Sequence, residues 1–169
     1  MDETTLLKFT KQMQVFLAGD ATLVTLTAYD ASTNRSIVID SGDQQITAPS
    51  LIIILDSTVP WLEDVDTIFD SLLTLVAYAD TRVVSMKIAM AAYNKVKQTA
   101  SGAKLQADAG FNAGNILTKS LSPIGFPESA GQTEGLQPES VRRTERSDAP
   151  IADRHITRLR IFCRWEDNG

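Results

Sequence analysis

Apolar residues recur every three or four positions near the start of the chain, which is the spacing that places side chains on one side of a helix. This pattern predicts a helix from Asp2 to Ala18, with an apolar stripe made of Leu6, Phe9, Met13, Phe16 and Leu17. Asp2 is placed to cap its first turn, and Gly19 is placed to end it in the left-handed conformation.

A second, short helix is expected over Ala21–Thr27, with Asp20 as its cap. It would bury Leu23, Val24 and Leu26. No basic face follows this helix pair, so the pattern does not favour a helix-turn-helix that binds DNA.

Three later stretches have the composition of β-strands. Arg35–Asp40 alternates around two isoleucines and predicts a short strand. Pro49–Asp56 is continuously apolar and rich in β-branched residues. Both of its faces should therefore be covered, one by helices and the other by a loop or a neighbouring subunit. Ser57–Thr67 is expected to be a loop that leads to a long strand over Phe69–Tyr78.

The long strand is expected to run directly into a helix over Thr81–Gln98 that Asp80 caps. No catalytic residue type stands at this junction, which argues for a scaffold. The helix has a broad apolar stripe, which suits a helix packed on both a sheet and a second helix. Its methionines, Met86 and Met90, are interpreted as filling gaps in the core.

Small and polar residues dominate between Ser101 and Gln137. A loop of this length is uncommon inside a compact domain and usually has a function of its own. The sequence therefore predicts an arm at about 101–137 that docks during assembly through scattered apolar side chains, namely Phe111, Ile116, Leu117, Leu121, Ile124 and Phe126.

Two strands are expected after the arm, over Glu139–Glu145 and Arg154–Trp165. In the second, buried apolar residues alternate with a ladder that includes Arg158, Arg160 and Arg164. All these elements together predict a single α+β domain over residues 1–169, in which a mainly antiparallel sheet of about four to five strands packs against two longer helices and one short helix.

Composition limits the class of protein. The chain has 169 residues, a net charge of −5 and one cysteine. Its length suffices for a core without disulfides or metal, and its acidic balance argues against broad binding of nucleic acid. The lone Cys163 fits assembly in a reducing cytoplasm. The start of the chain does not resemble a secretory signal, and no apolar run approaches the ~20 residues of a membrane span, so a soluble protein is expected.

Candidate catalytic chemistry is sparse. The acidic group Glu63, Asp64, Asp66 and Asp70 lacks the Asp-x-Asp-x-Asp-Gly pattern of a calcium loop, which favours a solvated loop. His155 is the only histidine, so a His-rich zinc set cannot form within one chain. Cys163 falls on the apolar side of its strand. The sequence predicts no enzyme activity, no catalytic residue, no metal and no cofactor.

The order of these elements resembles the tail completion, or tail terminator, family of long-tailed bacteriophages. The resemblance rests on the helix pair Leu6–Thr27, the Ala48-Pro49-Ser50 start of an apolar strand, the Leu-Thr-Leu-Val-Ala-Tyr-Ala-Asp junction at residues 73–80, and the strand Arg158–Asp167. It covers most of the chain, and Ser101–Gln137 is longer than is usual for the family.

The resemblance implies a virion protein, assembled in the host cytoplasm, that forms a ring on the end of the tail tube, typically a hexamer. Such a ring ends tube polymerisation and provides a docking surface. The implied partners are further copies of the chain, the tail tube protein and a neck or head-completion protein, with genomic DNA only passing through the ring and no membrane. Two alternatives stay open: a head-tail connector ring of the neck, and a small soluble metal-binding module or enzyme that uses residues 63–70.

A closed ring of identical subunits needs two different, complementary patches on each subunit. The apolar strand Leu51–Leu55, the loop around Trp61 and the arm are candidates, and the arginine ladder is interpreted as meeting an acidic patch on the next subunit. The candidate interface residues are Trp61, Leu62, Glu63, Asp64, Asp66, Asp70, Arg158, Arg160 and Arg164. The same residues also fit an ordinary solvated strand face and polar loop, because exposed ion pairs contribute little.

Overall fold

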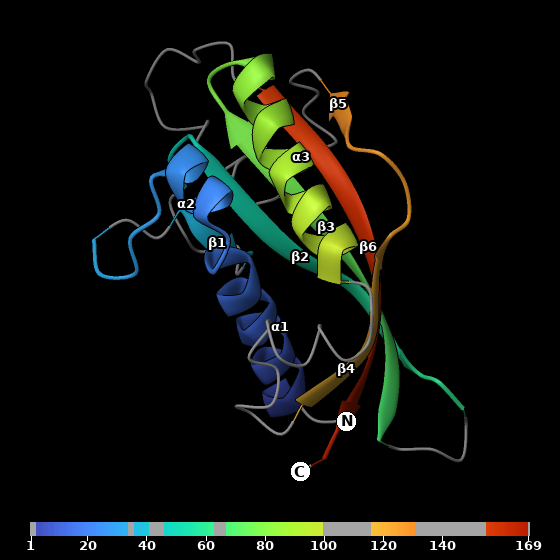
Figure 1. Ribbon diagram of the computed structural model, residues 1–169. Helices are drawn as coiled ribbons and strands as arrows, with labels where there is room; N and C mark the ends of the chain where they lie inside the picture. Colours follow the sequence, from blue (N-terminus) through green and yellow to red (C-terminus); the bar gives the residue numbers. More distant parts are fainter. Residues whose placement is uncertain are drawn as a thin grey trace.

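The computed structural model describes residues 3–33, 36–40, 46–62, 67–99, 116–130 and 155–168. In these residues a mainly antiparallel sheet is covered on one face by helices, which confirms the expected α+β class (Figure 1). The helices are α1 Glu3–Ala18, α2 Ala21–Thr27 and α3 Arg82–Thr99. The strands are β1 Ile37–Ile39, β2 Ser50–Pro60, β3 Ile68–Ala79, β4 Ile116–Pro123, β5 Glu128–Ala130 and β6 His155–Asp167.

The sheet is organised around β6. Its strand order is β1-β2-β3-β6-β4, and β5 also pairs with β6. One edge of β6 pairs with β3 along its length, while the other edge pairs with β4 near one end and with β5 near the other. β1 runs parallel to β2, and all the other described pairs are antiparallel. The strand that follows all the others in sequence therefore lies inside the sheet.

The main core lies between the helices and one face of the sheet. Phe9, Met13, Phe16 and Leu17 of α1 are buried, which confirms the predicted stripe. Phe9 stacks on Trp165 of β6 with ring centroids 4.6 Å apart and an interplanar angle of 8°. The Trp165 indole Nε1 donates a hydrogen bond of 2.9 Å to Ser71 Oγ on β3. Trp165 thus joins α1 to the two central strands.

A second, smaller apolar cluster covers part of the opposite face of the sheet. Its buried members are Val38, Ile46, Ile52, Val76, Tyr78 and Ile156. Since Leu51 and Ile53 face the main core while Ile52 faces this cluster, β2 is buried on both faces there, as its continuous apolar run predicts. The cover on this face comes from the chain itself. The alternation predicted for β3 is confirmed in the same way, with Leu75 on the helix side and Val76 on the other.

The helix termini follow the predicted chemistry only in part. Asp20 caps α2, because its side chain accepts a hydrogen bond from the backbone N–H of Leu23 at 2.9 Å. The left-handed conformation predicted for Gly19 is wrong: Ala28, after α2, holds it instead, with φ of 52°. The expected Asp80 cap of α3 is also wrong, because the Thr81 hydroxyl accepts from the N–H of Val84. Asp2 lies outside the described residues.

Two segments that were expected to be loops are strands. Ser57–Pro60 continues β2, because a register shift between Leu55 and Ser57 interrupts the pattern without ending the pairing with β3. Residues 116–130 of the expected arm form β4 and β5. A second shift, between Thr118 and Ser120, brings Ile116 and Leu121 to the same buried face although their spacing is odd. The expected strand Glu139–Glu145 lies outside the described residues.

The interpretation of α3 is correct for one side of the helix and wrong for the other. Ile88 and Ala92 are buried on the sheet, and α3 also contacts α2, as the broad stripe predicts. Met86 and Met90 were interpreted as core residues, yet both are only half-buried, and Val83 beside them is 63% exposed. The described part of the fold covers this second row of apolar side chains only in part.

Candidate interaction surface

The β2–β3 hairpin projects beyond the helix layer at the lower right of Figure 1. Near its described end, Val59, Trp61 and Leu62 are exposed by 55%, 42% and 50%. The candidate residues Glu63, Asp64 and Asp66 follow directly in sequence but lie outside the described residues. We call Val59, Trp61 and Leu62 the hairpin tip. Large apolar side chains left in water on a projecting hairpin are a feature of interaction sites.

Asp70 and Arg164 are paired within the same chain. The two residues are register partners on β3 and β6. Arg164 donates through Nε to Asp70 Oδ1 at 2.7 Å and through Nη2 to Oδ2 at 2.8 Å, which is the bidentate geometry of a strong ion pair. The hydrogen bond and the negative charge of Asp70 hold the pKa of Arg164 above its ordinary value, against the opposing effect of burial. Within this chain the carboxylate and the guanidinium therefore neutralise each other, and the idea that they contact the next subunit stays a prediction.

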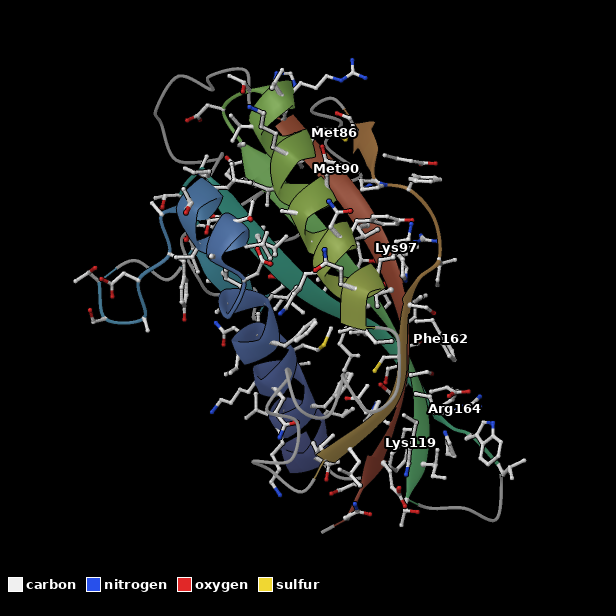
Figure 2. All side chains as sticks on the ribbon, in the orientation of Figure 1. Met86, Met90, Lys97, Lys119, Phe162 and Arg164 are labelled. Atoms are coloured by element: carbon white, nitrogen blue, oxygen red, sulfur yellow. The ribbon has the colours of Figure 1, made fainter. Side chains whose placement is uncertain are left out.

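Trp61 supports this ion pair from the hairpin. The guanidinium carbon of Arg164, which is labelled in Figure 2, lies 4.7 Å from the centroid of the Trp61 ring, a cation–π contact. The backbone N–H of Trp61 donates to the carbonyl of Ile68 at 2.9 Å, which closes the described end of the hairpin. The contacts among the side chains of Trp61, Arg164 and Asp70 hold the hairpin tip against the sheet.

Arg158 and Arg160 differ from Arg164, because no ion pair joins either of them to a residue that the structure describes. Successive side chains of a strand point to opposite faces, so Arg158 and Arg160 share a face of β6 with Ile156. This is the face away from the helices, because Ile156 belongs to the smaller apolar cluster there. Burial lowers the pKa of the Arg158 guanidinium, and the charge of Arg160 lowers it further. Glu128 stands opposite Arg158 in register without reaching ion-pair distance. Among the described residues, these two neighbouring cations therefore have no ion-pair partner on this face.

Apolar side chains accompany these arginines on the same face of the sheet. Phe162 lies between Arg160 and Arg164 along β6 and is register partner of Leu72, and both side chains are half-buried. Lys119 of β4, which is labelled in Figure 2, pairs with Glu166 of β6 at 2.5 Å. We call Arg158, Arg160, Phe162 and Leu72 the open face. It combines a partly exposed apolar surface with positive charge that no described carboxylate pairs with.

The arm residues are divided between the core and the surface. Ile116 and Leu121 are buried in the main core, so the idea that they dock on another molecule is wrong. Leu117 is half-buried. Ile124 and Phe126, in the connection between β4 and β5, are 58% and 75% exposed. Phe111 lies outside the described residues.

Neither Cys163 nor His155 has the surroundings of a catalytic residue. Cys163 is fully buried, and this burial, together with the negative charge of Asp70, strongly raises the pKa of its thiol. A thiol held protonated is a poor nucleophile. His155 is half-buried at the start of β6. In the part of the chain that the structure describes, no three His, Cys, Asp or Glu side chains gather as a set that could hold a metal ion.

Sequence reasoning missed the contact of Trp61 with Arg164 and the exposed position of Val59. The spacing of charges could have indicated the Asp70–Arg164 pair only if the strand register had been known, because the two residues are 94 positions apart. Among the described helices, none combines the length and the apolar character needed to cross a membrane. A scan of the sequence against protein-family models found no match, and a search of curated proteins found none either.

Proposed function

We propose that this chain is a ring-forming structural protein of a long-tailed bacteriophage, the tail terminator that caps the tail tube and offers a docking surface to the head and neck proteins. The observation that carries the proposal is the projecting hairpin tip with its exposed Val59, Trp61 and Leu62. The order of the helices and strands, from which the resemblance to that family arises, also supports it.

A ring requires contacts between two unlike surfaces of the same chain. The hairpin tip is apolar, and three carboxylates follow it in sequence at Glu63, Asp64 and Asp66. The open face has apolar side chains and two arginines that no described carboxylate neutralises. A tip that packs on the open face of the next copy would bury apolar surface and match charge, and repetition of this heterologous contact closes into a ring.

Charge also argues against the competing symmetric contact. If two open faces packed on each other around a two-fold axis, the arginines of one copy would approach those of the other. Like charges brought together at an interface disfavour the wrong arrangement. Head-to-tail assembly avoids this repulsion.

The first test is light scattering coupled to size exclusion, followed by negative-stain imaging of the large fractions. Rings alone, or rings seated on the ends of tail tubes from the parent virus, are expected. A connector ring of the neck would also form rings but would leave tube ends bare. A monomer that ignores tubes would refute both versions of the proposal.

A charge-swap experiment tests the contact itself. R158E/R160E should abolish assembly, because the carboxylates that follow the hairpin tip in sequence would then meet glutamates in place of arginines. E63K/D64K should also abolish assembly, because two of those carboxylates would be replaced by lysines, which the arginines of the open face repel. An equal mixture of the two variants should restore rings of alternating subunits, in which every contact joins opposite charges. K8E/K11E, on the exposed side of α1, is the charge-matched control and should assemble normally. If the mixture stays monomeric while circular dichroism shows both variants folded, the proposed contact is wrong.

A further inference from the structure

One side of α3 carries apolar side chains that the fold leaves partly uncovered. Val83, Met86, Met90 and Tyr93 recur at spacings of three and four, and Lys97 continues the same row. Val83 is 63% exposed, and Met86, Met90 and Tyr93 are half-buried. Figure 2 shows Met86, Met90 and Lys97 along this side of the helix. We call Val83, Met86, Met90 and Tyr93 the outer row of α3.

The connection between β4 and β5 contacts one end of the outer row. Phe126, itself 75% exposed, stacks on Tyr93 with ring centroids 5.4 Å apart and an interplanar angle of 25°. Ile124 in the same connection is 58% exposed. Lys97 Nζ lies 5.8 Å from the centroid of the Tyr93 ring. Phe126, stacked on Tyr93, extends the outer row into an apolar surface that is distinct from the hairpin tip and from the open face.

The charge of α3 indicates what kind of partner this surface fits. Arg82, Lys87, Lys95 and Lys97 are the charged residues of the helix, which contains no carboxylate. Lys95 lies over the ring of Phe16 on α1, with its Nζ 5.1 Å from the ring centroid, so the cations on the side of the outer row are Arg82, Lys87 and Lys97. This is a local excess of positive charge in a chain whose net charge is −5. Asp80 lies directly before the helix and Glu128 lies on β5, while β3 and β6, which also pack on α3, contain Asp70, Glu166 and Asp167. A partner with acidic residues beside an apolar stripe would match both features.

The spacing of the outer row favours a helical partner. A row at intervals of three and four is the surface into which the side chains of a second helix fit as knobs into holes. Methionine suits such a surface because its unbranched side chain adapts to different shapes. Pairing of two α3 helices from two copies would bring their cations together, so the partner differs from this chain's own α3.

We propose that the outer row of α3, with Phe126, binds an amphipathic helix of another polypeptide that has acidic residues beside its apolar stripe. This is recognition of a helix along an apolar surface. The inference does not rest on the proposed ring, because it uses other residues and another face of the molecule.

Methionine methyl groups provide a direct test. The full chain labelled with ¹³C at the methionine methyls reports separately on Met86 and Met90. Met13 of α1, which is fully buried in the main core, is the internal control. The probe is a synthetic helical peptide with leucines at intervals of three and four and glutamates beside them, and the comparison peptide has lysines in place of the glutamates. The glutamate peptide should shift the Met86 and Met90 signals and leave Met13 unchanged.

Variants separate binding from folding. Met90→Glu should weaken binding of the glutamate peptide by about tenfold or more, because it adds a like charge and removes an apolar contact. Val15→Glu, at a 65% exposed site on α1, should bind like the wild type. An unchanged Met13 signal shows that each variant is folded.

Three results would overturn the inference. They are no shift with the glutamate peptide, equal shifts with the lysine peptide, and shifts of Met86 and Met90 that depend on protein concentration without any peptide. The last result would mean that a second copy of the chain covers the surface.

Discussion

The stacking of Phe9 on Trp165 predicts that this aromatic contact contributes strongly to holding α1 on the sheet. Phe9→Ala is the perturbation. The Phe9 side chain is fully buried, and its ring lies almost parallel to the Trp165 indole at 4.6 Å. Removal of a buried phenylalanine costs about 3–5 kcal/mol of unfolding free energy, which combines the lost transfer term with the cavity left behind. In a domain of this size 1 kcal/mol lowers the midpoint temperature by about 2–4 °C, so the midpoint should fall by about 6–20 °C.

The assay is urea unfolding followed by tryptophan fluorescence. It is best done in a Trp61→Phe background, so that Trp165 is the only indole and reports on the contact itself. Val15→Ala is the matched control on the same helix, because Val15 is 65% exposed and its truncation should change stability by no more than about 0.5 kcal/mol. If Phe9→Ala proved no more destabilising than Val15→Ala, with the same denaturant slope, the argument that this stack holds α1 would be wrong.

Three further predictions concern the caps, the buried hydroxyls and the buried thiol. Asp20→Ala should lower the free energy of unfolding by about 1 kcal/mol and Asp20→Ser by much less, measured by thermal unfolding, because serine also caps α2. Ser85→Ala should cost about 1–3 kcal/mol by leaving the buried Thr157 hydroxyl without its 2.8 Å partner. The double variant with Thr157→Val should cost less than the two single changes together, and strict additivity in chemical unfolding would contradict the pairing. Native Cys163 should not react with a thiol-specific disulfide reagent until the protein unfolds. Burial raises the pKa of this thiol above the ordinary 9.0, so the thiol of the unfolded chain loses its proton at a lower pH than that of the native protein. The contribution of the thiol to the free energy of unfolding should therefore be constant below about pH 9 and decrease as the pH rises further. Cys163→Ala should lack this alkaline decrease.

The parts of the fold with a strong local pattern could be predicted from the sequence. The apolar stripe of α1, the Asp20 cap and the alternation of β3 each depend on residues near one another in the chain, and the structure confirms them. The strand β6 was predicted for the same reason. Where a register shift interrupted the period, as in β2 and β4, the pattern ended early and a loop was expected instead of a strand.

The candidate site was harder to predict because its contacts are long-range. Periodicity placed Arg158, Arg160 and Arg164 on one face, but it could not show that Asp70 neutralises only Arg164. That distinction depends on the pairing of β3 with β6, which no local pattern specifies. Burial of the arm residues Ile116 and Leu121 is a tertiary effect of the same kind, since both face the core only after β4 pairs with β6.

The inner position of β6 has a consequence for how the protein is made. Translation produces β2, β3, β4 and β5 before residues 155–167, so these strands leave the ribosome while the centre of their sheet is still missing. Pairing of β3 with β6 also closes a long loop, as the separation of 94 residues between Asp70 and Arg164 shows, and such contacts form slowly. A nascent chain stopped before His155 would therefore expose unpaired apolar strand edges, which promote aggregation and chaperone binding. Completion of the sheet thus depends on synthesis of β6.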